Sequence, residues 1–231
     1  MINLNIYTSL ILSITIQFIS GIIEVIALFI KVPSKFLLLK QMLLLEVIVQ
    51  FIEASFYIYW FYNFNNILNI TPKRYFDWAI TTPTMLITLI FYLIFLKNKN
   101  NVRNDGINYK QPNFFQLFNQ EFYTIIIIFL LNWLMLLFGY LGEINVMPTM
   151  LAVLLGFIPF LIYYYIIYKK YAISSNEGLN IFYYFFIIWS LYGVVAVLPY
   201  KIKNMGYNIL DLFAKNFFGI FLSYLLFTNT F

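Results

Sequence analysis

The chain of 231 residues contains no cysteine and no histidine. Without cysteine it has no disulfide bonds, thiolate metal sites or cysteine nucleophiles. Without histidine it lacks the commonest metal ligand and the side chain that titrates nearest to neutral pH. Any proton chemistry therefore depends on carboxylates, lysine and water, and we expect no metal site.

Charged residues are also scarce, at 10% of the chain, whereas hydrophobic residues make up 63%. Soluble domains have about 25% charged residues, and one membrane crossing takes about 20 apolar residues. The chain divides into seven candidate spans, at residues 4–30, 36–63, 74–96, 118–141, 147–170, 179–200 and 205–228. Their apolar runs lack the alternation of barrel strands. We therefore predict an integral, multi-pass membrane protein of the all-α class, with residues 1–231 in one seven-helix domain.

The basic residues predict how the chain is oriented in the bilayer. Nine lie in or near the first, third and fifth connections: Lys31, Lys35, Lys40, Lys97, Lys99, Arg103, Lys110, Lys169 and Lys170. The opposite side has only Lys73, Lys201 and Lys203, with Arg74 at a helix edge. Because lysine and arginine concentrate on the cytoplasmic side, we predict an extracellular N-terminus and a cytoplasmic C-terminus. The net charge of +5 thus indicates topology and a lipid bilayer as partner, not nucleic acid.

Seven charged residues fall at membrane depth: Glu24, Glu46, Glu53, Arg74, Asp77, Asp211 and Lys215. A lone charge there costs about 2.5–3.5 kcal/mol even on the lenient insertion scale, so we expect these groups to face one another or water. The nearest partner for Lys215 is Asp211, one helical turn earlier on the same face. The other acids, Asp105, Glu121, Glu143 and Glu177, fall in or next to loops and are expected to be solvated, as is the polar stretch 97–113.

The third span carries the densest group of polar residues. Arg74, Asp77 and Thr81 follow at spacings of three and four, which places them on one helix face. Pro83 frees a backbone carbonyl one turn back, and Thr82 is placed to help satisfy it. Two carboxylates and one lysine in a dry interior suit a protonated Schiff base with its counterions, because a cationic imine needs negative charge nearby.

Three motifs support that interpretation. Residues 74–83 are Arg-Tyr-x-Asp-Trp-x-x-Thr-Thr-Pro, Trp189 and Tyr192 form Trp-x-x-Tyr, and the last span has Asp-x-x-x-Lys at Asp211 and Lys215. With these motifs in this order on seven spans, the chain resembles the microbial (type 1) rhodopsins.

The resemblance implies a retinal protein without enzymatic activity. It implies that Lys215 binds all-trans retinal, that Asp77 is the primary counterion and proton acceptor, and that Asp211 is the second counterion. Arg74 is then the charge on the extracellular side. The residues implied to surround the polyene are Trp78, Thr82, Met85, Trp189 and Tyr192. Met85 occupies a position where methionine accompanies green absorption, and Gly193 replaces a proline of the family, which we expect to loosen the pocket.

The type of rhodopsin is harder to assign. Outward proton pumps of the family have a carboxylate donor eleven residues after the counterion, where this chain has Thr88. No acid is present from Leu191 to Leu210, where such pumps have release glutamates. In contrast, the second span has Glu46 and Glu53 two turns apart on one face.

These acids favour an ion pathway. Glu53 resembles in position a glutamate that gates channelrhodopsins, and Asn216 and Ser13 complete a possible constriction beside the Schiff base. The predicted pathway comprises Ser13, Glu24, Glu46, Glu53, Thr81 and Asn216. With its small size and asparagine-rich composition, the chain is similar to the rhodopsins of large DNA viruses, in particular the group of light-gated cation channels.

We therefore expect a light-gated channel for monovalent cations, located in the host cell membrane if the chain is viral. An outward proton pump that uses Glu46 or Glu53 as donor is the alternative, and a sensory photoreceptor is a third. A non-retinal transporter is a remote fourth. Homo-oligomers are a further expectation, because the family forms dimers, trimers and pentamers.

Overall fold

The computed structural model of the chain describes residues 5–33, 36–105 and 112–228. These residues form six continuous helices and a seventh span that is divided into three parts. The continuous helices are α1 (Ile6–Leu28), α2 (Leu37–Tyr62), α3 (Thr71–Asp105), α4 (Phe114–Glu143), α5 (Thr149–Lys170) and α6 (Asn176–Ala196). The last span consists of α7 (Tyr200–Asp211), a π-helical segment (Leu212–Asn216) and α8 (Phe217–Thr228). The predicted all-α, seven-helix fold is confirmed.

Side-chain hydrogen bonds between residues close in sequence stabilise the first turns of α1 and α4. Asn5 accepts a hydrogen bond from the backbone N–H of Thr8, whose hydroxyl accepts one from the Asn5 N–H in return. Asn113 and Gln116 make the same reciprocal pair at the start of α4. Such pairs satisfy the amide groups that the first helical turn leaves without partners.

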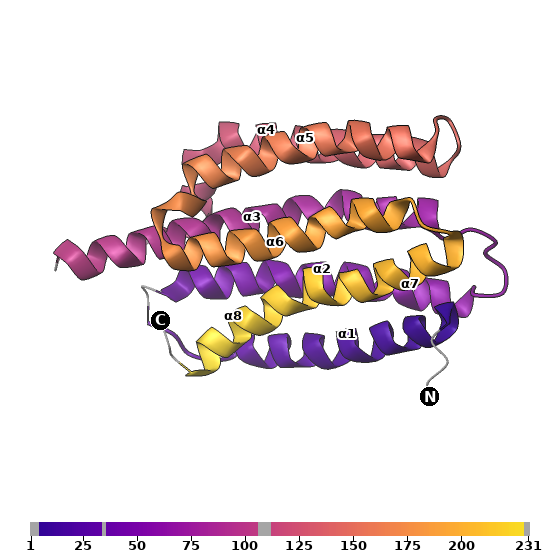
Figure 1. Ribbon diagram of the computed structural model, residues 1–231. Coiled ribbons are helices and arrows are strands. Elements are labelled where there is room, and N and C mark those ends of the chain that lie inside the picture. The colour runs from indigo at the N-terminus through magenta and orange to yellow at the C-terminus, as the bar shows by residue number, and fades with distance from the viewer. Residues whose placement is uncertain (1–4, 34–35, 106–111, 229–231) are drawn as a thin grey trace.

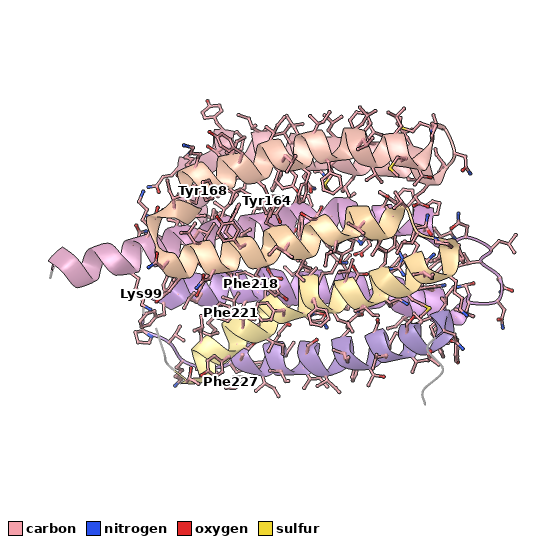
Figure 2. All side chains as sticks on the ribbon, viewed as in Figure 1. Lys99, Tyr164, Tyr168, Phe218, Phe221 and Phe227 are labelled. Carbon is pink, nitrogen blue, oxygen red and sulfur yellow. The ribbon has the colours of Figure 1, made fainter. Side chains whose placement is uncertain are left out.

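The helices form a closed ring in which each packs against its neighbours in sequence. In Figure 1 they lie roughly parallel, with α4 and α5 along one edge and α1 and α8 along the opposite edge. The last span closes the ring, because both α7 and α8 contact α1. The first residues of α1 and the last residues of α8 lie at opposite ends of the bundle, as an odd number of crossings requires.

The distribution of side chains suits a membrane interior. Six of the helical spans are long and apolar enough to cross a bilayer, and α2, with 26 residues, is also long enough. Large apolar side chains such as Phe18 and Phe51 point outward, at 68% and 75% exposure. All seven charged residues predicted at membrane depth are buried inside the ring, as expected for groups that lipid does not solvate.

Two expectations about connections are wrong. The helix α3 continues through Lys97 to Asp105, so part of the polar stretch 97–113 is helical. Glu143, expected to be solvated, is the last residue of α4 and is only 9% exposed. Its carboxylate lies 2.8 Å from Nζ of Lys203 on α7, which compensates for the burial of its charge. Lys35 and Lys110, which entered the orientation argument, lie outside the described residues.

The contact between α4 and α5 depends on one glycine. A Cβ at Gly142 would lie 2.6 Å from the Cβ of Ala152. A methyl group fixed to the backbone cannot rotate away, so we expect Gly142→Ala to force the helices apart and to cost about 1–3 kcal/mol. Thermal unfolding in detergent would measure this as a lower midpoint. The double variant with Ala152→Gly restores the space, and an unchanged midpoint in the single variant would contradict the packing described.

Candidate functional site

Lys215 is buried inside the bundle, within the π-helical segment, and is 2% exposed. Its Nζ lies 2.6 Å from Oδ2 of Asp77 on α3 and 3.6 Å from Oε1 of Glu53 on α2. A buried ammonium requires such carboxylates, because its desolvation is costly. The expected pair with Asp211 is wrong, since within the described part of the chain Lys215 makes its ion pairs with Asp77 and Glu53.

Asp211 is held by three other side chains. One carboxylate oxygen accepts hydrogen bonds from the hydroxyl of Tyr57 at 2.6 Å and from the guanidinium of Arg74 at 3.3 Å. The second oxygen accepts one from the hydroxyl of Tyr192 at 2.7 Å. These donors come from α2, α3 and α6, so Asp211 ties three helices to the last span. Its oxygens face these donors and not the lysine.

Arg74 is fully buried and makes a dense set of contacts. It donates hydrogen bonds to the side-chain oxygens of Asn208 and Asn204 on α7, the latter at 3.2 Å. Its guanidinium also lies 4.9 Å from the ring of Trp60, close enough for a cation–π contact. Neither asparagine belongs to the motifs from which the site was predicted. Their spacing of four and then three residues before Asp211 places all three on one helix face and would have indicated them.

The proline in α3 is accommodated differently from the expectation. The carbonyl of Ala79, four residues before Pro83, accepts a hydrogen bond of 2.8 Å from the indole N–H of Trp133 on α4. The hydroxyl of Thr82 donates instead to the carbonyl of Trp78 at 2.7 Å. A residue distant in sequence therefore satisfies the freed carbonyl, and the prediction that Thr82 does so is wrong.

A cavity of about 110 Å³ reaches Lys215. The five residues predicted to surround a polyene, Trp78, Thr82, Met85, Trp189 and Tyr192, all line it. Further lining residues that the sequence analysis missed include Tyr75, Met135, Leu136, Phe157, Phe160 and Tyr207. The lining is almost entirely apolar or aromatic, and among the described residues Lys215 is its only charged side chain. The cavity therefore fits a long apolar group joined to Lys215, as ligand sites of this composition do.

Two glycines of this cavity leave room for rings of neighbouring helices. A Cβ at Gly193 would lie 2.5 Å from the ring of Phe157 on α5. A Cβ at Gly139 would lie 2.6 Å from the hydroxyl oxygen of Tyr75. The expectation that Gly193 loosens the pocket is therefore wrong, because the Phe157 ring fills the space beside it.

The predicted constriction is not joined by direct hydrogen bonds in the described structure. The hydroxyl of Ser13 donates to the backbone carbonyl of Asn208 at 3.0 Å. The side-chain amide of Asn216 donates to the hydroxyl of Ser20 at 2.7 Å. Ser13, Asn216 and Glu53 are all buried, but neither Ser13 nor Asn216 forms its hydrogen bond with Glu53.

The remaining residues of the predicted pathway are also buried and have specific partners. Glu46 on α2 accepts a short hydrogen bond from the hydroxyl of Thr88 on α3. Glu24 on α1 accepts one from the side-chain amide of Gln50 at 3.2 Å. The hydroxyl of Thr81 donates to the backbone carbonyl one turn earlier, at 3.0 Å. Glu46 therefore places a carboxyl beside the threonine that stands where a donor acid was expected.

Comparison with known proteins supports one family. The family model described as bacteriorhodopsin-like protein matches residues 5–229. No protein with a curated description matches the chain.

Solved structures have the same fold over almost the whole chain. The viral rhodopsin OLPVRII is 29% identical, with a TM-score of 0.80 over 98% of this chain and 99% of its own. The blue light-absorbing proteorhodopsin from Med12 is 18% identical, with a TM-score of 0.73 over 97% and 98%. Xanthorhodopsin, a light-driven ion pump with dual chromophore, is 17% identical, with a TM-score of 0.71 over 97% and 93%. The family match, the seven-helix bundle and the cavity that ends at a buried lysine agree, and the chain belongs to the bacteriorhodopsin-like family of retinal-binding microbial rhodopsins.

Proposed function

We propose that this rhodopsin is a light-driven outward proton pump, with all-trans retinal bound to Lys215 as a protonated Schiff base. The observation that carries the proposal is the hydrogen bond between Glu46 and Thr88. Thr88 stands where pumps of the family have their donor carboxylate, and Glu46 brings a carboxyl to that position from α2. The donor that α3 lacks is thus supplied by the neighbouring helix.

The residues around the cavity fit retinal. Trp78, Trp189 and Tyr192 provide aromatic walls for the polyene, and Lys215 provides the amine at the end of the cavity. When bound, retinal supplies a light-absorbing polyene and a cationic imine. The Nζ of Lys215 stands in for the imine nitrogen, and Asp77 lies 2.6 Å from it.

Asp77 is the better proton acceptor of the two aspartates. Asp211 already accepts hydrogen bonds from Tyr57, Tyr192 and Arg74, so its oxygens face these donors and not the lysine. One oxygen of Asp77 accepts a hydrogen bond from Nζ of Lys215. The other oxygen has no hydrogen-bond partner among the described residues. Asp77 would therefore be the group that takes up a proton from the nitrogen of Lys215.

The donor lies on the other side of the lysine along the membrane normal. Thr88 follows Asp77 by eleven residues, or about 16.5 Å along an α-helix, in the direction away from Arg74. Glu46 is 1% exposed and therefore shielded from bulk water. Acceptor and donor on opposite sides of the nitrogen give transport a direction, which is outward if the N-terminus is extracellular.

We expect Lys215→Ala to abolish the visible absorption band that forms when retinal is added to the apoprotein, because no other described residue that lines the cavity carries an amine. Absorption spectroscopy of the purified protein measures this. Lys203→Ala, which changes a lysine paired with Glu143 outside the cavity, keeps the band. A full band in Lys215→Ala would refute the attachment site.

We expect Glu46→Gln to slow reprotonation of the Schiff base by about 100-fold, the lower end of what a positioned acid contributes. Flash photolysis at neutral pH measures this as the decay of the deprotonated intermediate, which becomes dependent on external pH in the variant. Glu121→Gln, at the partly exposed pair with Lys170, serves as the matched control. An unchanged decay in Glu46→Gln would exclude Glu46 as donor.

A light-gated cation channel remains the second candidate, because Glu53 brings a second carboxylate to the lysine. Glu53 is fully buried, lies 3.6 Å from Nζ of Lys215, and neither of its oxygens has a hydrogen-bond partner among the described residues. Acidic groups in an interior path attract cations. The pump is preferred because Ser13 and Asn216, the other members of the expected constriction, bind Asn208 and Ser20 instead.

Voltage-clamp recording under illumination distinguishes the candidates. For a pump we expect a current that stays outward at every membrane voltage and that is lost in Asp77→Asn. A current that reverses with the cation gradient would favour the channel. A slow photocycle with negligible current would favour a sensory photoreceptor.

A further inference from the structure

A row of buried polar side chains follows one face of α1. Gln17, Ser20 and Glu24 are spaced three and four residues apart, and their exposed fractions are 2%, 4% and 0%. They extend over about 10.5 Å at 1.5 Å per residue. This row lies outside the retinal cavity and is not part of the ion pairs around Lys215.

Hydrogen bonds connect the row to the lysine segment. The side-chain amide of Asn216, the residue directly after Lys215, donates to the hydroxyl of Ser20 at 2.7 Å. The side-chain amide of Gln50 on α2 donates to Oε1 of Glu24 at 3.2 Å and lies 3.5 Å from the same serine hydroxyl. Glu24 is therefore connected to the lysine segment through two polar side chains.

One glycine makes room for this carboxyl. A Cβ at Gly219 on α8 would overlap with the carboxyl group of Glu24. The Glu24 carboxyl therefore lies directly against the backbone of α8, one turn after Lys215. Any movement of the lysine segment changes the surface against which Glu24 packs.

The row contains polar atoms that need further partners. In the described residues, Oε2 of Glu24, Oε1 of Gln50, Oδ1 of Asn216 and both amide atoms of Gln17 have no hydrogen-bond partner. A buried polar group without a partner is destabilising, and a polar site of this kind commonly holds water. The unpaired atoms of the row can therefore form hydrogen bonds with internal water between α1, α2 and the last span.

We propose that Glu24 is a second light-responsive carboxyl site of this protein, coupled to Lys215 through Asn216, Ser20 and Gln50, with water as the ligand of the unpaired atoms. Gly219 is the residue that admits the carboxyl to this position. When the lysine segment moves, Asn216 shifts its bond to Ser20, and the hydrogen bonding of Glu24 changes. Gln50, which donates to Glu24, lies one turn after the proposed donor Glu46 on α2, so a change at Glu24 affects the surroundings of that donor.

Light-minus-dark infrared difference spectra test the site directly. We expect the wild type to show a carboxyl band that is lost in Glu24→Gln and displaced in Gly219→Ala. Gly21→Ala is the matched control, because a Cβ at Gly21 on the same helix as Glu24 meets nothing within 4 Å. A wild-type spectrum that keeps all of its carboxyl bands in Glu24→Gln would overturn the proposal.

Gln50→Met keeps the test decisive if Glu24→Gln forms no pigment. It removes the hydrogen bond to Glu24 without removing the carboxyl, so the Glu24 band shifts, and an unshifted spectrum would overturn the coupling. The kinetic part rests on the proposed proton pump. There we expect Glu24→Gln to change the decay of the deprotonated intermediate by about fivefold, equivalent to about 1 kcal/mol. A Glu24 band in a protein that pumps no protons would support this site and refute the pump.

Discussion

The buried ammonium of Lys215 is the constraint on which the rest of the site depends. It stays in a dry interior only because Asp77 and Glu53 compensate for its lost hydration. Asp211 is compensated in turn by Arg74. α3 thus contributes one cation and one anion, and the last span contributes the opposite members. The pair of Lys215 with Asp211 that was expected within the last span is replaced by two pairs between helices, which hold α3 against the last span.

This arrangement divides the polar interior into two unlike halves. On the Arg74 side, hydrogen bonds with Tyr57, Asn204 and Asn208 satisfy the charged groups closely. On the side of Glu46 and Glu24, and at Gln17, Gln50 and Asn216, side-chain atoms lack partners in the described residues. A closely bonded half resists rearrangement, whereas a half with unpaired atoms can take up water. Such asymmetry suits a protein that moves protons in one direction after light absorption.

Much of the site was predictable because its motifs are local. Spacing along one helix placed Arg74 and Asp77 on a common face, and the five residues predicted to surround a polyene all line one cavity with Lys215. The sequence was a poorer guide to hydrogen-bond and ion-pair partners that lie on different helices. The carbonyl freed by Pro83 is satisfied by Trp133, from a helix that carries no recognisable motif there. Glu143 forms an ion pair with Lys203, which follows it by sixty residues in the sequence, so no local pattern indicates that Glu143 is buried.

The sequence by itself determined the number of spans, the family, and the set of charged residues that must be inside. Composition and helical period are properties of short segments, and a lipid environment leaves a charged residue few alternatives. Only the tertiary structure decided which charges pair, that Ser13 and Asn216 bind residues other than Glu53, and that Glu46 meets Thr88. These contacts depend on the rotation and axial position of one helix against another, which result from the packing of the whole ring.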